Sequence, residues 1–415
     1  MNPFSFTFLG ALLTTTSVKI WLAARHAAHI RKHRDTVPAG FAEQIALDAH
    51  QKAADYSIAK TQMEITHTLI ECAVLLALTF GGGLQFLHEM TAARIEPGIV
   101  RGIVLITLVA VGLMLVDFPF TWYRTFSIEQ RFGFNKMTPR MFFADTLKQT
   151  LVAAALGVPL VAIVLWLISR TGNAWWIYAW LVWMAFNLFL LVAYPIWIAP
   201  LFNKFSPLEN TQLRQRIEQL LARCGFKAQG LMVMDGSRRS SHGNAYFTGF
   251  GKSKRIVFFD TLLERLDGPE VEAVLAHELG HFKLRHVIKR MAWIFLASLG
   301  LLWLLSQSMN TTWFYAGLNV QAPSTAMALI LFFLVSPQFT FLLHPLTSLY
   351  ARKHEFEADR YAAQYASALA LVSALIKLYK DNATTLTPDP LHSAFYDSHP
   401  PAPLRIARLQ SYMGC

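Results

Sequence analysis

A chain of 415 residues that is 54% hydrophobic and only 15% charged is not composed like a soluble protein, because soluble domains carry charges on about a quarter of their residues. Its formal net charge of +11 does not indicate nucleic-acid binding, since the Lys and Arg residues flank apolar stretches, where they meet anionic lipid. The composition therefore predicts an integral membrane protein with the lipid bilayer as its partner, and it excludes nucleic acid.

Seven apolar stretches are long enough to cross a bilayer as helices, which takes about 20 residues. We expect spans near Phe4–Ala23, Ile65–Leu87, Gly102–Phe120, Leu151–Ile168, Trp175–Pro200, Met291–Met309 and Thr325–Leu349. The apolar residues are clustered rather than periodic, which disfavours the alternative of buried helices in a large soluble protein. The first stretch is not a cleavable signal peptide, because its basic residues follow it instead of preceding it.

Basic residues are distributed unevenly among the loops between these stretches. The loops after the first and third spans are rich in Lys and Arg, whereas residues 310–324 contain neither. Since basic loops remain on the cytoplasmic side, we expect the N-terminus outside, and the C-terminus and both long polar segments on the cytoplasmic side. In a bacterium, the membrane would be the inner (plasma) membrane.

Polar segments divide the chain into four parts. We expect spans one to five in residues 1–202, a polar segment in 203–290, spans six and seven in 291–350, and a C-terminal segment in 351–415. The first polar segment combines an amphipathic helix with short strands, of which the last two form a hairpin. These elements are expected at Thr211–Cys224, Leu231–Met234, Ala245–Phe250 and Arg255–Asp260.

The helix predicted for Val271–Arg285 carries the pattern His-Glu-x-x-His, in which His277 and His281 are four residues apart. Residues at this spacing share a helix face, so both imidazoles can bind one tetrahedral zinc ion. Glu278 lies one step round the helix, where it can take a proton from an activated water but cannot easily be a ligand. The alternative, two surface histidines beside a solvated Glu, is disfavoured because apolar residues surround the motif.

A catalytic metal site requires a third protein ligand. Just after the last span, Glu355 and Asp359 are four residues apart and share a helix face, whereas Glu357 points nearly opposite. One of the two carboxylates can bind the metal while the other accepts a hydrogen bond from a ligating imidazole. The alternative for this segment is an exposed charged helix beside the membrane.

Hydrolysis of an amide also requires donors for the developing oxyanion. The turn Ser398–Pro401, followed by Arg405, offers the imidazole of His399 and a guanidinium, although a plain turn is the simpler reading. Asn244 precedes a predicted strand and could hydrogen-bond an extended peptide, since a strand edge can pair with one.

Taken together, the motifs resemble those of the type I CAAX prenyl endopeptidases over nearly the whole chain. The resemblance rests on Glu129–Lys136, Ser240–Tyr246, the His-Glu-x-x-His helix, Glu355–Asp359, and Ser398–Pro401 with Arg405. It implies one zinc ion held by His277, His281 and Glu355, with Glu278 as the base and Asp359 supporting the site. It also implies contacts of His399, Arg405 and Asn244 with the substrate or transition state.

The resemblance further implies an all-α multi-span membrane fold. Seven helices would form an α-barrel around a water-filled chamber, with a small α+β zinc metalloprotease domain on the cytoplasmic side. Ionisable residues inside two expected spans, His67 with Glu71 and Asp117, fit a wet interior, although His67 and Glu71 could equally satisfy each other as a buried pair.

We expect a bacterial-like member of this family whose substrate is a polypeptide, prenylated or membrane-associated. One alternative is a membrane quality-control metalloprotease of the heat-shock type. Another is a metal-binding receptor or transporter without catalysis, which Glu278 disfavours because a pure binding site needs no base.

Overall fold

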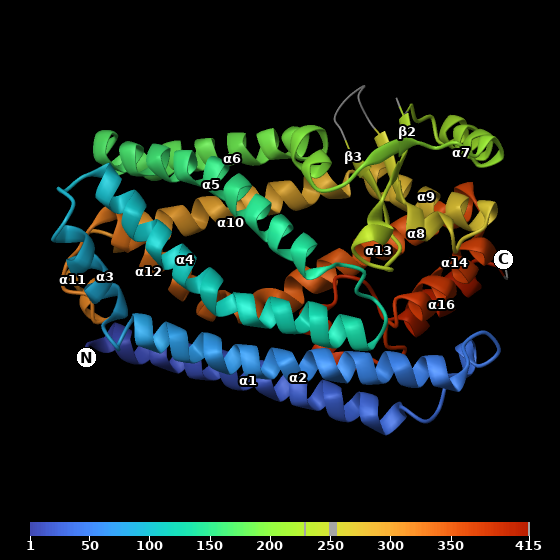
Figure 1. The fold of residues 1–415 in the computed structure, drawn as a ribbon, viewed down its shortest axis with the longest axis horizontal. Helices are drawn as coiled ribbons and strands as arrows, with labels where there is room; N and C mark the ends of the chain where they lie inside the picture. The colour runs from blue at the N-terminus through green and yellow to red at the C-terminus, as the bar shows by residue number, and fades with distance from the viewer. Residues whose placement is uncertain (228–229, 249–254, 414–415) are drawn as a thin grey trace.

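The structure is a computed structural model, and it describes residues 1–227, 230–248 and 255–413. Long helices run along the longest axis of the molecule (Figure 1). Helix α1 begins at one end of this axis, and α16 (Ala402–Ser411) lies at the other. The two ends of the described chain are therefore separated by the full length of the helical region.

Within the described residues, six helical segments are long and apolar enough to cross a membrane. Six of the seven expected spans coincide with them. The segments are α1 (Pro3–His33), α4 (Ile99–Tyr123) continuing through η2 (Arg124–Glu129), α5 (Pro139–Arg170), α6 (Trp175–Ala193) with its flanking turns, α10 (His286–Ser308), and α12 (Thr325–Thr340) continuing through η7 (Phe341–Leu343) into α13 (His344–Tyr365).

The remaining expected span, Ile65–Leu87, is not one continuous helix. Instead, α2 (Leu47–Leu78) and α3 (Gly83–Ala92) meet at an angle of 50°. Gly82, between them, has a φ of +77°, a left-handed conformation that glycine adopts without steric cost. A run of glycines thus bends the chain, and the pair makes a seventh span only if both helices cross the membrane together.

Four of the apolar helices are thinly packed. In the most apolar stretches of α4, α5, α6 and α10, no more than 11% of the residues are buried, whereas in the stretch within α12 and α13 the share is 44%. A helix inside a packed bundle would bury a stripe at least 100° wide against its neighbours. Most of the surface of these four helices is therefore left uncovered by the rest of the described chain, while α12 packs against α1 and α4.

The first polar segment forms a small sheet with helices against it. Its four strands have the order β1-β2-β4-β3, in which β2 and β4 are parallel and the other pairs are antiparallel. The strands are β1 (Phe205–Pro207), β2 (Gly230–Met234), β3 (Ala245–Thr248) and β4 (Arg255–Phe259). Strands β3 and β4 make the predicted hairpin, although its connection, 249–254, lies outside the described residues. The expectation did not include β1, which is only three residues long.

Helix α9 (Gly268–Lys283) crosses the centre of this region. The carboxylate of Asp267 accepts a hydrogen bond from the backbone N–H of Glu270, whose carboxylate accepts one from the N–H of Asp267. This reciprocal cap satisfies two N–H groups that a helix start leaves unpaired. The apolar positions of α9, including Leu275 and Leu279, are buried in one core with residues of the sheet and its neighbouring helices.

The helices around α9 complete this end of the molecule (Figure 1). They are α7 (Thr211–Arg223), α8 (Asp260–Leu263), α14 (Ala368–Asp381) and α16, while α11 (Thr312–Ala316) lies at the opposite end. Helix α15 (Pro390–Tyr396) packs against α13 and α1. Both α13 and α14 pack on α9. Helix α9, which carries the His-Glu-x-x-His motif, therefore lies directly beside α13, the end of the last apolar segment.

Candidate metal centre

Close approach of α9 and α13 determines where the candidate ligands meet. Gly280, inside the His-Glu-x-x-His motif, faces α13, and a Cβ there would lie 3.0 Å from Ala358 Cα and 3.0 Å from Tyr361 Cβ. Carbon atoms normally pack about 3.5–4.0 Å apart. The missing side chain at Gly280 thus lets the two helix backbones come together and brings the two motif histidines opposite Glu355.

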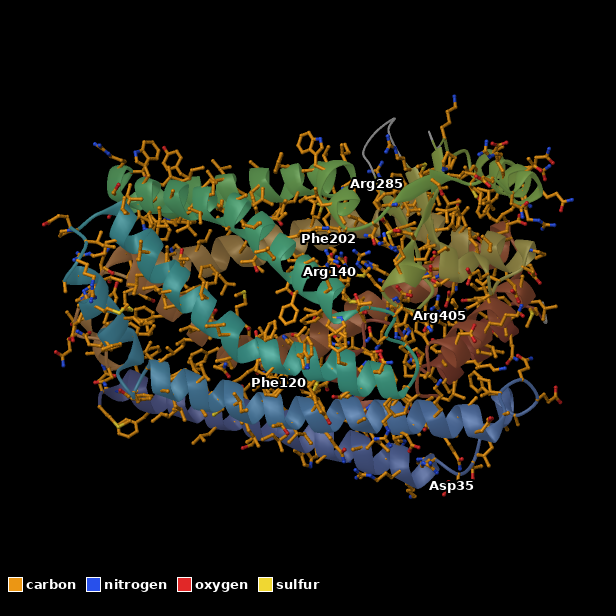
Figure 2. The ribbon with its side chains drawn as sticks, in the orientation of Figure 1. Asp35, Phe120, Arg140, Phe202, Arg285 and Arg405 are labelled. Atoms are coloured by element: carbon orange, nitrogen blue, oxygen red, sulfur yellow. The ribbon has the colours of Figure 1, made fainter. Side chains whose placement is uncertain are left out.

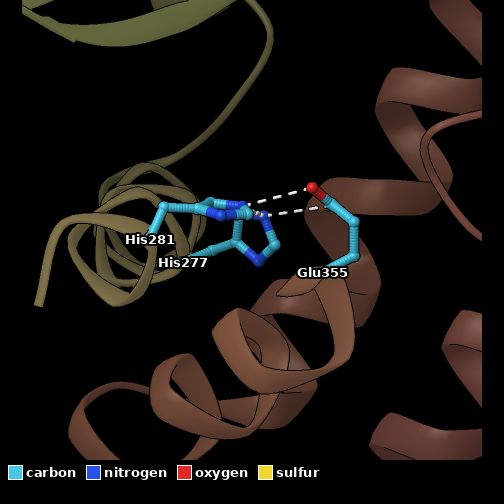
Figure 3. Close-up of side chains that lie close together, drawn as sticks. All are labelled: His277, His281 and Glu355. Carbon is cyan, nitrogen blue, oxygen red and sulfur yellow. Dashed lines mark hydrogen bonds and ion pairs between the residues drawn. The ribbon is translucent and has the colours of Figure 1, made fainter. Parts of the chain in front are cut away.

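Three side chains from these two helices converge on one point (Figure 3). The Nε2 atoms of His277 and His281 are 3.1 Å apart. His277 Nε2 lies 3.5 Å from Glu355 Oε2, and His281 Nε2 lies 3.2 Å from Glu355 Oε1. His277 and Glu355 are buried, and His281 is partly exposed.

The spacing of these atoms fits a metal ion. A tetrahedral ion with bonds of about 2.0–2.1 Å holds its ligand atoms about 3.3 Å apart, close to the three distances observed. Oε2 of Glu355 is buried and accepts no hydrogen bond from any residue that the structure describes, although a buried carboxylate oxygen normally has a partner. Two imidazoles and a carboxylate are also a donor set typical of catalytic zinc.

A buried carboxylate and guanidinium lie behind His277. Its Nδ1 is 2.8 Å from Asp359 Oδ1, so the N–H on Nδ1 points to Asp359 and Nε2 is the nitrogen that faces Glu355 and His281. Arg405 donates to both oxygens of Asp359, through Nε and Nη2, each at 2.7 Å. These contacts fix both the orientation and the tautomer of the His277 ring.

The charges around His277 act on its pKa in opposite directions. Burial and the guanidinium of Arg405 lower this pKa, but the negative carboxylates of Asp359 and Glu355 outweigh them and raise it to about 9. Only the neutral ring has a lone pair for a metal. A cation that enters the site must therefore displace a proton, and the carboxylates that attract this proton attract the cation as well.

The sequence singled out two further residues near this centre. Glu278 is partly buried, and within the described residues its carboxylate has no hydrogen bond or ion pair. His399 has a side chain that is 63% exposed, with Nε2 lying 3.5 Å from Glu355 Oε1. Its Nδ1 lies 3.1 Å from the hydroxyl of Ser398, so a proton on Nε2 can point toward the centre.

Arg405 is placed differently from the expectation of a donor open to substrate. It is buried, its Nε and Nη2 donate hydrogen bonds to Asp359, and Nη2 also lies 3.1 Å from Nδ1 of the His277 ring. Figure 2 shows it at the inner end of α16, beside the region where α9 and α13 meet. The Nε and Nη2 groups of Arg405 are thus engaged by the carboxylate of Asp359, beside the ring of His277.

Asn244 is exposed just before β3, an edge strand of the sheet.

The segment that precedes Asn244 is held by contacts that the sequence analysis did not predict. His242 Nδ1 lies 3.1 Å from Asn382 Oδ1, and Nε2 lies 3.7 Å from a carboxylate oxygen of Glu129. Glu129 in turn accepts a hydrogen bond of 2.6 Å from the hydroxyl of Tyr56. Glu129 lies in the motif Glu129–Lys136 and His242 in the motif Ser240–Tyr246. That both motifs belong to the same family resemblance was the only feature of the sequence that linked these two loops.

The fold and this donor set define an integral membrane metallopeptidase. Two family models together match almost the whole chain. A model described as CAAX prenyl protease N-terminal, five membrane helices, matches residues 26–204, and the model of peptidase family M48 matches residues 207–413. The chain belongs to peptidase family M48.

Known proteins similar to the chain share nearly its full length. The CAAX prenyl protease 1 homolog of Arabidopsis thaliana is 33% identical over 414 residues, which cover 97% of each chain. That of Homo sapiens is 32% identical over 454 residues, covering 97% of this chain and 95% of the human one. The crystal structure of S. mikatae Ste24p matches with a TM-score of 0.92 at 28% identity, covering 99% of both chains.

The chain is therefore a multi-pass membrane metalloendopeptidase, and its family implies a catalytic metal. This finding excludes the alternative of a receptor or transporter that performs no hydrolysis. The relatives named above are eukaryotic, and the expectation of a bacterial-like member is not borne out.

Proposed function

We propose that the protein is a zinc endopeptidase that cleaves prenylated CAAX proteins near their C-termini, with one zinc ion bound by His277, His281 and Glu355. The observation that carries the proposal is the triangle of two imidazole nitrogens and a carboxylate, with sides of 3.1 to 3.5 Å and one carboxylate oxygen without a hydrogen bond. The substrate class is taken from the relatives, which are named CAAX prenyl proteases.

The proposed mechanism divides the work between the metal and Glu278. A zinc ion held at this site would polarise the scissile carbonyl and lower the pKa of a water molecule to about 7. Glu278 takes a proton from the attacking water and returns it to the leaving amine nitrogen. Within the described residues no ion pair or hydrogen bond occupies its carboxylate, which leaves this residue available for both transfers.

His399 is proposed to stabilise the oxyanion, because its imidazole is exposed on the open side of the centre and only 3.5 Å from Glu355. Asp359 and Arg405 are instead proposed to hold His277. A pair as deeply buried as Asp359 and Arg405 is costly to break, since removing one partner leaves an unpaired buried charge. Asp359 and Arg405 therefore hold the ring of His277 rigidly.

Asn244 is proposed to align the substrate. Strand β3 pairs with β4 on one side only, and an exposed strand edge can hydrogen-bond an extended peptide along its backbone. The exposed amide of Asn244 lies where this edge begins. A substrate bound in this way must be extended or flexible, which fits the C-terminal tail of a protein better than a folded domain.

A water-filled chamber between the helices is the proposed surrounding of this centre. The low burial of α4, α5, α6 and α10 supports it, as does the contact of 2.9 Å between His67 Nε2 and Asp117 Oδ1, whose side chains are 28% and 58% exposed. Ionisable groups at such depth usually face water or a partner. A cavity of about 720 Å³ between α4 and α5, lined mainly by apolar side chains, offers a surface suited to a prenyl group.

The proposed topology has seven spans, with α2 and α3 together as the second. An odd number of spans puts the two termini on opposite sides of the membrane. The basic loops then place the N-terminus outside and the C-terminus, with the metal centre, on the cytoplasmic side. The proposed division at residue 202, between the first five spans and the polar segment, lies close to the junction of the two family models.

A quality-control role in the membrane remains the second candidate, because an extended segment of a damaged membrane protein could occupy the same strand edge. The names of the relatives favour the prenyl protease role.

The experiment that discriminates between the two roles compares cleavage of two peptides of identical sequence, one prenylated and one not, together with metal analysis of the purified protein. We expect one zinc ion per chain and faster cleavage of the prenylated peptide. Equal cleavage would refute the preference for prenylated substrates, and activity without any bound metal would refute the mechanism.

A further inference from the structure

A second group of ionisable side chains lies on the other side of His281 from the metal centre. His281 Nδ1 is 3.0 Å from His286 Nδ1, and His286 Nε2 is 2.9 Å from Glu357 Oε2. The ring of His286 is stacked on that of His354, with centroids 4.0 Å apart and planes inclined by 8°. His286 and His354 are buried, whereas the side chain of Glu357 is partly exposed.

The path of the chain brings these residues together. Helix α9 ends at Lys283, and Arg285 takes up the left-handed conformation with a φ of +57° before α10 begins at His286. A bulky residue rarely adopts this conformation unless its surroundings impose it. The corner turns His286 back against His281, and Glu357 reaches it from α13, two residues beyond the candidate ligand Glu355.

The two hydrogen-bonding contacts of His286 allow only one arrangement of protons among neutral rings when His281 binds a metal. That His281 binds a metal is part of the proposed function. A neutral imidazole has one N–H and one lone pair. If Nε2 of His281 gives its lone pair to the metal, Nδ1 must carry the proton and donate it to Nδ1 of His286. His286 then carries its own proton on Nε2 and donates it to the carboxylate of Glu357.

We propose that His286 and Glu357 are positioning residues for the metal ligand His281. They hold its ring in the plane needed for coordination and fix the tautomer that leaves Nε2 without a proton. The two histidine ligands are thus supported differently, since His277 donates directly to a carboxylate and His281 reaches one through a second imidazole. Such supporting groups typically change metal affinity by about 10–100-fold.

A second metal ion bound by His286, His354 and Glu357 would be another use of these residues, because their ligand atoms lie within 4.8 Å of one another. The geometry disfavours it. The lone pairs of an imidazole lie in the plane of its ring, so two nearly parallel rings with centroids 4.0 Å apart keep their lone pairs in separate parallel planes, and these do not meet at one ion. Both nitrogens of His286 are also already paired.

The test uses the purified full chain and compares three substitutions. His286→Phe keeps an aromatic ring against His354 but removes the acceptor for His281. His286→Asn places an amide oxygen where Nδ1 stood and should restore that acceptor, while His354→Phe keeps the stack and leaves the hydrogen-bonded chain intact. The readouts are the zinc dissociation constant, from competition with a chelator, and the visible absorption spectrum of the protein loaded with Co²⁺.

We expect His286→Phe to weaken zinc binding by about 10–100-fold and to alter the Co²⁺ spectrum. His286→Asn and His354→Phe should both resemble the wild type. If His286→Phe does not fold, Glu357→Leu on the partly exposed side carries the test and should weaken zinc binding to a smaller degree. Wild-type affinity and spectrum in the Phe and Leu variants that fold would overturn the proposal.

Two controls separate this proposal from the others. His281→Ala must lose the metal, and if it does not, the proposed metal site itself fails independently of His286. A second equivalent of zinc in the wild type that disappears in His354→Phe would show a second metal site and would also overturn the positioning role. One equivalent in both proteins supports it.

Discussion

Substitution of Gly280 by Ala tests whether the close approach of two helices sets the metal geometry. The added Cβ would lie 3.0 Å from Ala358 Cα and from Tyr361 Cβ, and 3.3 Å from the carbonyl oxygen of Ala358. Two of these neighbours are backbone atoms that cannot rotate away. To reach an ordinary carbon contact of about 3.5–4.0 Å, α9 and α13 must separate by about 0.5–1 Å.

The magnitude of the effect follows from this separation. Metal–ligand distances hold to within about 0.2 Å, so the required movement exceeds what the site tolerates between His277 or His281 on α9 and Glu355 on α13. Overpacking of this kind costs about 1–3 kcal/mol, partly offset by about 1 kcal/mol from the better helix propensity of Ala. To bind zinc, α9 and α13 of the variant must be brought back to the wild-type distance, and this costs the overpacking energy. Zinc affinity should therefore fall by about 5–150-fold, the factor that corresponds to 1–3 kcal/mol.

The assay is chelator competition for zinc, with thermal unfolding of the metal-free protein measured alongside. Gly300→Ala is the matched control, because Gly300 also lies inside a helix but a Cβ there has nothing within 4 Å. The control should bind zinc like the wild type. If Gly280→Ala did so too, with unchanged peptide cleavage, the distance between α9 and α13 would not determine the ligand geometry.

The other predictions concern the roles of single residues and the topology. Glu278→Gln should retain zinc but lose activity by about 10²–10⁴-fold, and near-normal turnover with one bound zinc would rule out Glu278 as the base. Glu355→Ala should release zinc, whereas Asp359→Asn should weaken it by about 10–100-fold, as metal analysis and chelator competition can show; the reverse order would exchange their roles. In a variant without its native cysteines, a cysteine added after Met1 should react with an impermeant reagent outside the cell, and one placed near Gly414 should not. The opposite labelling would invert the topology.

Much of the candidate site was predictable because its chemistry is encoded in local spacing. His277 and His281 share a helix face through their separation of four residues, and Glu278 lies beside them for the same reason. The start of α9 was equally readable, since Asp267, Pro269 and Glu270 cap a helix in any surroundings. Such features need no knowledge of the rest of the chain.

The role of Arg405 could not be read in this way. Its position after the Ser398–Pro401 turn favoured a donor for the oxyanion, but the packing of α16 directs its guanidinium at Asp359 and the ring of His277. The contact of His281 with His286 was likewise invisible, because it depends on the left-handed corner at Arg285. Strand β1 was missed since three residues carry too little pattern for a prediction.

The sequence by itself determined what each segment is: which stretches are apolar enough for a membrane, which helix carries the paired histidines, and which carboxylates are available as a third ligand. These properties follow from composition and from periods of two to four residues, which act within a single element. Only the tertiary structure decided which elements meet. Glu355 reaches the histidines because Gly280 lets α13 lie against α9, and Arg405 lies behind His277 because α16 folds back on α14. Such contacts join residues far apart in the chain, and their geometry is set by the packing of side chains that no local pattern contains.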